Sequence, residues 1–502
     1  MSLASLYSNE NKLSWFCASV TALISASLVF IAVLNAYYVS GDMQDIGWNS
    51  TNAWHNVLSI QGPPAFPSSF FNVHMSLIFW VTNLFSYILP LSKINFFAAL
   101  CGCIYSLFAV GIYRLWRLNG GQNASATIIA LATTFSAIGM QALRLPHIEM
   151  AIPALGLWFF LSIIQKKTYS AIIFFTLCLM VREDAGFHLF GILFLWLLTL
   201  KISDPKTPLP RNILAFAAAS VCYSIIIMIV KGSFFAIYSN MSTIYAGNPP
   251  WQHLTYQLIT TRIDFFFYNR TYITLPFLVS IIWAIRARNP LLPLGYIAAI
   301  PWLIFNLLAI RPCPAALNFY YPFPFWLALA WPLIATLLWK CKTKEIKWPY
   351  FLILLFSLIG WQKERFIVYP LDNNVFDAHP FLISEEWGQQ RAVQTFIDYF
   401  TEHKELFKKS AIDMPVFSIV IDVNNGVLWI GDWNKMNPHF LPEMIVYFDK
   451  AYEWTAWVEP TLDAYPGHYK YYYALPKTKI RLASIKPLEE IIPSSHPFVS
   501  TK

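Results

Sequence analysis

Long apolar segments recur along this chain and constrain its fold more than any other feature. The sequence has 57% hydrophobic and 12% charged residues and a mean hydropathy of +0.49, which is too apolar for a soluble protein. A helix needs about 20 apolar residues to cross a hydrocarbon core about 30 Å thick. Eleven segments approach that length: 13–37, 93–115, 124–142, 149–165, 168–181, 185–200, 212–230, 272–286, 291–310, 320–339 and 347–361. The sequence therefore predicts an α-helical, multi-pass membrane protein with about eleven transmembrane helices.

Basic residues predict the orientation of these helices. A further apolar segment, 74–90, is interpreted as a helix lying along the outer interface, because counting it as a span would place Arg114 and Arg117 outside. With this interpretation, fourteen basic residues fall in the inner loops and seven in the outer loops, as the positive-inside rule prefers. We therefore expect a cytoplasmic N-terminus and an external C-terminus. The formal charge of +8 is attributed to this orientation, and no nucleic-acid partner is expected.

The composition changes after residue 361, where charged residues and histidine become common and no further span follows. This change predicts two domains, a transmembrane domain at 1–361 and an external α/β domain at 362–502. Within the second domain, 384–410 has the apolar spacing of a helix. Segments 416–423 and 426–433 are predicted to form a β-hairpin around an Asn-Asn-Gly turn.

Polar residues gather in the loops that this topology places outside. Ten of them are candidates for one site on the outer face: Asp42, Asp45, His74, Arg144, His147, Glu149, Arg182, Glu183, Asp184 and Arg311. Ionisable residues at the edge of a span are uncommon without a function. The long outer loop at 231–271 is expected to act as a lid or binding loop.

Four motifs in the first 200 residues resemble, in order and spacing, those of a bacterial and archaeal family of multi-pass membrane proteins. They are DIGWNSTNAW (45–54), NVHMSLIFW (72–80), LPHIEMAIPALGL (145–157) and MVREDAGFHLFGILFLW (180–196). That family is similar to the GT-C glycosyltransferase superfamily. Its first motif usually has a second acidic residue five positions after the first, where this chain has Ser50. The departure leaves Asp45 as the main acidic candidate and Asp42 as a possible substitute.

The resemblance implies a GT-C-like fold and an enzyme of the bacterial inner membrane, surrounded by membrane lipids. Such an enzyme transfers a sugar from a polyprenyl-phosphate donor to a glycan, lipid or protein acceptor on the outer face. Asp45, or Asp42 in its place, would act as the general base that takes the proton of the acceptor hydroxyl. Groups that stabilise the charge growing on the phosphate would come from Arg144, Arg182, Arg311, His74 and His147. Groups that orient these residues, hold the acceptor or bind a divalent cation would be Glu149, Glu183 and Asp184.

Other interpretations remain open. A secondary transporter or a non-catalytic sensor or assembly protein would also have many spans, although a transporter would place its ionisable residues deeper in the bilayer. Asp42 and Asp45 would also suit the cap of a helix that begins near Trp48, because aspartate before a helix satisfies free N–H groups. The Arg-Glu-Asp sequence at 182–184 would also fit an ordinary charged turn.

Overall fold

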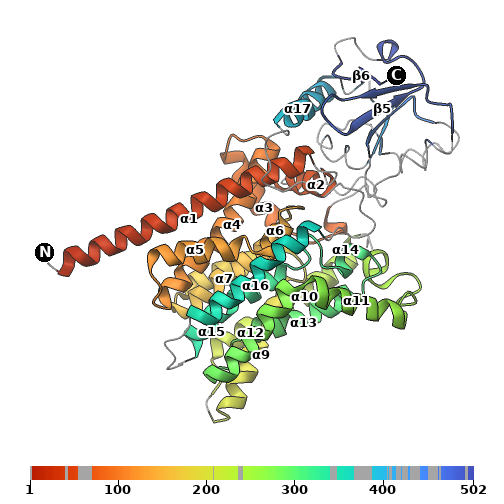
Figure 1. Cartoon of the computed structure of the whole chain (residues 1–502). Helices are drawn as coiled ribbons and strands as arrows, with labels where there is room; N and C mark the ends of the chain where they lie inside the picture. Colours follow the sequence, from red (N-terminus) through yellow and green to blue (C-terminus); the bar gives the residue numbers. More distant parts are fainter. Residues whose placement is uncertain are drawn as a thin grey trace. The chain divides into compact units, whose positions relative to one another are not determined.

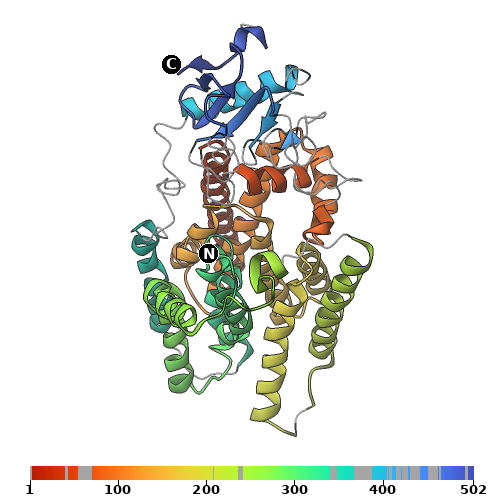
Figure 2. The same cartoon turned by 90° about the vertical axis from the view of Figure 1, so that its right-hand side faces the viewer.

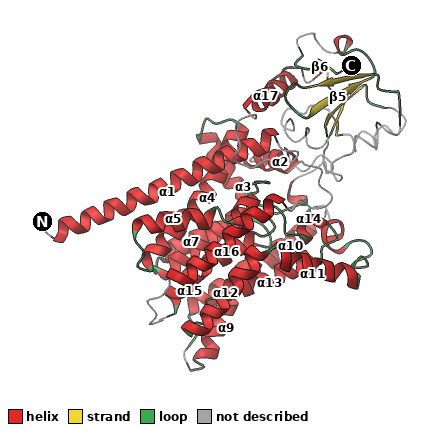
Figure 3. Cartoon of the chain, viewed as in Figure 1, coloured by secondary structure: helices red, strands yellow, loops and turns green. Residues whose placement is uncertain are grey.

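The protein is mostly helical and carries a small β-sheet near its C-terminus (Figures 1 and 3). The computed structural model describes residues 3–39, 43–54, 70–206, 208–235, 241–339, 347–366, 387–403, 405, 407, 410–413, 416, 420, 428–429, 441–449, 462, 465–491 and 496–501. The helical bulk and the C-terminal sheet agree with the predicted fold class at this coarse level.

The chain divides into two compact units. Unit 1 comprises Met1–Phe30, Phe71–Ile78 and Ala99–Ile367, and unit 2 comprises Ile31–Phe70, Phe79–Ala98 and Val368–Lys502. The division therefore passes through three helices, which are α1 (Leu3–Val39), α3 (Ile78–Ile88) and α4 (Lys93–Leu118). The predicted domain boundary after residue 361 lies inside α16 (Lys347–Phe366) and stays a prediction.

Unit 1 is a bundle of helices that pack side by side (Figures 1 and 2). Beyond α4 and before α16 its helices are α5 (Asn123–Thr134), α6 (Ala137–Ala142), α7 (Ala151–Ile164), α8 (Thr168–Val181), α9 (Ala185–Ser203), α10 (Arg211–Phe234), α11 (Tyr256–Asn269), α12 (Thr271–Ala287), α13 (Leu294–Leu307), α14 (Pro312–Ala315) and α15 (Phe323–Leu338). Shorter helical turns are η1 (Phe70–Asn72), η2 (Ile148–Met150) and η3 (Met241–Ala246). Helix α7 packs against α8 and α15, and α9 packs against α10 and α13.

Each of the eleven predicted apolar segments contains a helix. Among the described residues, four helices are long and apolar enough to cross a membrane: Lys12–Tyr38 within α1, α4, α9 and α10. The bent pair α11 and α12, which meet at 74°, would make a fifth. Helix α3 has 11 residues, so at 1.5 Å per residue it is about 16 Å long and too short to span. Its length suits the interfacial helix that we expected, and the number of eleven spans stays a prediction.

Unit 2 contains helix α2 (Met43–Ala53), helix α17 (Trp387–Glu402) and the sheet. The described strands are β1 (Ser410–Ile412), β2 (Leu428–Trp429), β3 (Met444–Phe448), β4 (Tyr471–Ala474), β5 (Ile480–Ser484) and β6 (Val499–Ser500). Their order is β2-β1-β3-β5-β4-β6, with β1 parallel to β2 and β3 and the other pairs antiparallel. Side chains such as Ile412, Val446, Leu482 and Phe396 are fully buried and form the core.

The predicted hairpin is wrong. Val416 and Val420, which were expected in its first strand, are helical, and the other residues of 416–423 lie outside the described ones. The second expected strand contains β2, but β2 pairs in parallel with β1. A parallel pair requires a crossover connection, so β1 and β2 do not form a hairpin, and the Asn-Asn-Gly sequence itself lies outside the described residues. The helix expected at 384–410 is confirmed in its central part as α17.

Candidate functional site

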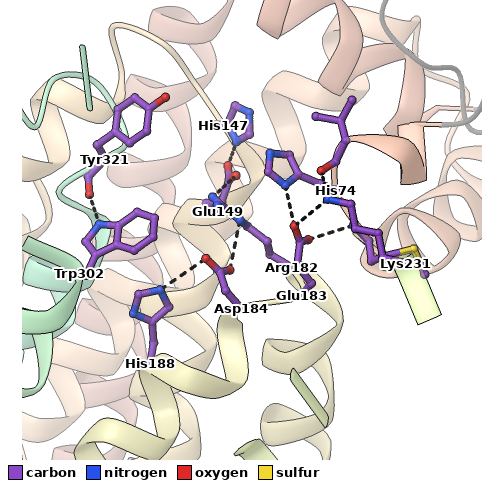
Figure 4. Close-up of polar contacts among 12 residues, drawn as sticks. His74, His147, Glu149, Arg182, Glu183, Asp184, His188, Lys231, Trp302 and Tyr321 are labelled. Carbon is purple, nitrogen blue, oxygen red and sulfur yellow. Dashed lines mark hydrogen bonds and ion pairs between the residues drawn. The ribbon is translucent and has the colours of Figure 1, made fainter. Parts of the chain in front are cut away.

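Ionisable side chains from four separate segments of unit 1 converge in one place (Figure 4). We call this group the charged cluster, and it consists of His74, His147, Glu149, Arg182, Glu183, Asp184, His188 and Lys231. The segments are the chain before α3, the start of α7, the turn between α8 and α9 with the first turn of α9, and the last turn of α10. The cluster therefore lies where the ends of four helices meet.

Glu183 holds one half of the cluster together. Its Oε1 lies 3.0 Å from Nδ1 of His74 and 3.4 Å from Nζ of Lys231. Its Oε2 accepts a hydrogen bond of 3.0 Å from the backbone N–H of Met75. Lys231 also donates to the carbonyl oxygen of Val73. One carboxylate thus fixes the chain at 73–75 to the turn between α8 and α9.

Arg182 holds the other half. Its Nη1 donates to Oε1 of Glu149 over 3.0 Å, and its Nε lies 3.1 Å from Oδ1 of Asp184. The other carboxylate oxygen of Glu149 contacts Nδ1 of His147. The guanidinium carbon of Arg182 lies 5.7 Å from the centre of the Trp302 ring, in a cation–π contact. Arg182 is therefore held between two carboxylates and beside an aromatic ring.

Helix ends explain why these charges suit their positions. Asp184 is the residue that precedes α9, and Glu149 lies in the turn before α7, so both carboxylates are near the partially positive N-terminus of a helix. Lys231 lies in the last turn of α10, where the partially negative C-terminus favours a cation. Arg182 has extended backbone angles (φ −159°, ψ 154°) that end α8 and start the turn.

The cluster is buried. The side chains of its ion pairs are at most 15% exposed, and buried charges persist only when they are paired and hydrogen-bonded. Burial lowers the pKa of His74, although Glu183 acts to raise it. Burial also lowers the pKa of His147, with His74 and Arg182 acting in the same direction. Burial acts to raise the pKa of Glu183, but His74, Lys231 and Arg182 hold that pKa well below its usual range. At neutral pH, therefore, both histidines are neutral and Glu183 is ionised.

Two members of the cluster were missed from the sequence. Lys231 was counted only as an orientation signal at the end of a span, and nothing local links it to Glu183. His188 lies four residues after Asp184, with its Nε2 3.9 Å from Oδ2 of that aspartate. This i to i+4 spacing places His188 on the same side of the start of α9 as Asp184. From the sequence, it could have identified His188 as a candidate.

Aromatic residues of other segments border the cluster. Tyr320 stacks on His147 with 4.1 Å between ring centres, and the His188 ring packs edge-on against Trp302 and Phe323. Tyr245, from the outer loop expected to act as a lid or binding loop, lies beside Arg182. His188 also lines a small apolar cavity formed by residues of α7, α9, α13 and the start of α15. The cluster is thus polar on one side and borders an apolar space on another.

The predicted site residues fall into two groups. Six of the ten converge in the charged cluster: His74, His147, Glu149, Arg182, Glu183 and Asp184. Arg144 is half-buried after α6, Arg311 is exposed before α14, and neither is among the residues joined by the contacts above.

The two aspartates of the first motif belong to a different part of the chain. Asp42 lies outside the described residues, and Asp45 is in the first turn of α2, in unit 2, with its side chain outside the described part. Helix α2 begins at Met43, five residues before the expected start near Trp48. Asp45 is therefore inside the helix and not before it.

No metal site is evident among the side chains that the structure describes, because no three His, Cys, Asp or Glu residues there are placed to hold an ion together. The divalent cation that the resemblance allowed has no ligand set in this part of the chain.

No protein-family model and no curated protein matches this chain. The likeness to the GT-C superfamily thus stays a prediction from the four sequence motifs.

Proposed function

We propose that this protein is a membrane glycosyltransferase of the bacterial inner membrane. It would transfer a sugar from a polyprenyl-phosphate donor to a glycan, lipid or protein acceptor on the outer face. The N-terminus would lie in the cytoplasm and the C-terminal domain outside. The observation that supports this proposal best is the convergence of buried ionisable groups at the ends of apolar helices.

The position of the cluster favours an enzyme over a transporter. A transporter binds its substrate near the middle of the bilayer, at interrupted helices. The cluster instead lies at the start of α7, the end of α8, the start of α9 and the end of α10. In an up-and-down bundle these four ends lie on the same side, where a membrane surface meets water. A lipid-linked substrate presents its polar head at that level.

The surroundings of the cluster also suit a substrate with two kinds of surface. Ionised and hydrogen-bonding groups lie on one side, and an apolar cavity lined by His188, Ile152 and Leu189 lies on the other. Sites for small molecules commonly combine an apolar lining with a few polar groups that fix orientation. A sugar attached to a lipid has the matching polar and apolar parts.

The general base is assigned from the first sequence motif. We propose Asp45 as the general base because it carries the Asp-x-Gly of that motif. Asp45→Asn keeps the size of the side chain but cannot take a proton, so transfer should fall by a factor of about 10² to 10⁴. Asp42→Asn should reduce sugar transfer much less.

The experiment measures sugar transfer by the purified full-length protein from a panel of undecaprenyl phosphoryl sugars. Expression level and melting temperature serve as controls for both variants. Full activity in Asp45→Asn would remove its catalytic role and leave Asp45 as a residue of the first turn of α2. A wild-type protein that transfers no sugar but takes up a solute with protons in vesicles would favour the transporter.

A further inference from the structure

Helix α11 turns sharply away from the helix that follows it. It ends at Asn269, α12 begins at Thr271, and their axes meet at 74°. Helix α12 has 17 residues and is about 26 Å long, so it can cross most of a core about 30 Å thick without α11. With α12 along the membrane normal, the 14 residues of α11 would add only about 6 Å of depth. Helix α11 would then lie close to the plane of the membrane.

Hydrogen bonds to carbonyl oxygens fasten α11 at the end of the bundle. Nη1 of Arg262 donates to the carbonyl oxygen of Leu307 over 2.8 Å, and Leu307 is the last residue of α13. At the bend, Nε of Arg270 donates to the carbonyl oxygen of Ala316 over 2.7 Å. The predicted topology places the end of α13 on the outer side of the membrane. Helix α11 is therefore expected at the level of the outer membrane surface.

One edge of α11 exposes large apolar side chains. Tyr256, Ile263 and Phe267 are 86%, 40% and 63% exposed, and their spacing of i, i+7 and i+11 places them along one stripe of a helix. The buried side of the helix contains the polar residues Arg262 and Asn269. Water disfavours exposed apolar area of this kind. This stripe is therefore suited to apolar surroundings.

The neighbouring edge of the same helix is polar. Gln257, Thr261 and Asp264 are exposed there, and Tyr268, on the same stripe, is 73% exposed. Tyr268 directly follows Phe267, so their side chains leave the helix about 100° apart. A carboxylate is costly in the hydrocarbon core. The presence of Asp264 on this edge therefore favours the membrane interface over the interior of the bilayer.

We propose that α11 is an interfacial helix that binds the outer leaflet of the lipid bilayer. The stripe of Tyr256, Ile263 and Phe267 lies among the acyl chains, and the stripe that includes Asp264 and Tyr268 faces headgroups and water. Amphipathic helices of this kind bury their apolar face about 5 to 10 Å into the boundary between headgroups and chains, a level at which tyrosine is enriched. This contact requires only that the protein lies in a membrane, and it is independent of the reaction at the charged cluster.

The test measures which solvent surrounds each edge of α11. A para-trifluoromethyl-phenylalanine replaces one aromatic residue at a time in the full-length protein, which is reconstituted in lipid nanodiscs. Fluorine NMR relaxation is recorded with dissolved oxygen, which concentrates in the bilayer, and with a nickel chelate, which stays in water. Oxygen should have the larger effect on probes at Phe267 and Tyr256. Nickel should have the larger effect on a probe at Tyr268.

Two exposed aromatic residues outside α11 are the matched controls. Phe194 is 48% exposed in the middle of α9 and reports the hydrocarbon core, and Tyr465 is 47% exposed in the C-terminal domain and reports water. The ratio of the oxygen effect to the nickel effect should be high at Phe194, Phe267 and Tyr256. It should be low at Tyr268 and Tyr465.

Two results would overturn the proposal. Ratios at Phe267 and Tyr256 as low as that at Tyr465 would make α11 part of a solvated loop. A ratio at Tyr268 as high as that at Phe194 would place the whole of α11 inside the bilayer, as half of a broken span. If the probe at Phe267 prevents folding, Tyr256 decides the test, since its side chain is 86% exposed.

Discussion

At the scale of single residues, Glu183 joins segments of the site that are far apart in sequence, which no local sequence pattern predicts. Its two oxygens face donors from His74, Met75 and Lys231, so this one carboxylate joins three stretches of chain. Breaking a buried ion pair by removing one partner typically costs about 3 to 5 kcal/mol, because the other charge stays buried. The stability of this part of the protein should therefore depend on the protonation of the cluster.

We expect the protein to lose stability as the pH falls below about 6.5. Burial lowers the pKa of His74 and His147 below the ordinary 6.5, so the unfolded chain binds these protons more tightly than the folded one. Their contribution is fully present above pH 6.5 and is lost on acidification. The lowered pKa of Glu183 adds a loss below its ordinary 4.5. All three effects have the same sign.

Thermal unfolding in detergent between pH 8 and pH 5 checks this expectation. The melting temperature should be nearly constant above pH 7 and should fall below 6.5. In the double variant His74→Asn, His147→Asn, the melting temperature should decrease much less on acidification. The control His468→Asn, at an exposed position, should show the same decrease as the wild-type protein. A melting temperature that rises on acidification would contradict the assignment of neutral, buried histidines.

At the scale of elements, α9 and α10 pack closely beside the charged cluster. A Cβ atom on Gly186 would lie 2.1 Å from the carbonyl oxygen of Ser220 and 2.6 Å from Oγ of Ser224. Both serines belong to α10, and Gly186 lies two residues after Asp184. The absence of a side chain at Gly186 thus lets the start of α9 approach α10 closely.

Gly186→Ala should destabilise the protein by about 1 to 3 kcal/mol, as overpacking of a close contact usually does. Gly191→Ala is a matched control on the same helix, since its nearest neighbour would be Ala298 O at 3.5 Å, an ordinary contact. Alanine is a better helix former than glycine by about 1 kcal/mol, so Gly191→Ala should be neutral or slightly stabilising. Melting temperatures of the two variants in detergent should show this order, and the reverse order would contradict the close packing.

Apolar runs allowed the helices to be predicted, because a span needs a continuous hydrophobic stretch. The break between α5 and α6 and the 74° bend before α12 have no equivalent signal in the sequence. The parallel pairing of β1 with β2 is non-local. Six site residues were found because charges beside spans are rare, whereas Lys231 was missed because its partner Glu183 is 48 residues away in sequence.

At the scale of the whole molecule, the predicted orientation is the property that an experiment can check most directly. Reporter fusions at residues 119, 204 and 343 should lie inside and fusions at 245 and 400 outside, because the basic residues are concentrated in the loops assigned to the inner side. The short α3 supports this arrangement, since about 16 Å of helix does not cross the bilayer core. An external signal at 119 would mean that segment 74–90 spans the membrane.

The lengths of the helices around the cluster have a consequence for the surrounding bilayer. Helices α7 and α8 have 14 residues each, so each is about 21 Å long, well short of a hydrocarbon core of about 30 Å. Helix α10 has 24 residues and is about 36 Å long. If α7 and α8 cross the bilayer, as the sequence predicts, the hydrocarbon core beside α8 should be thinner than elsewhere. Lipid headgroups would then sink toward the level of Arg182 and Glu183, and a lipid-linked substrate could arrive by lateral diffusion with its hydrocarbon chain still in the bilayer.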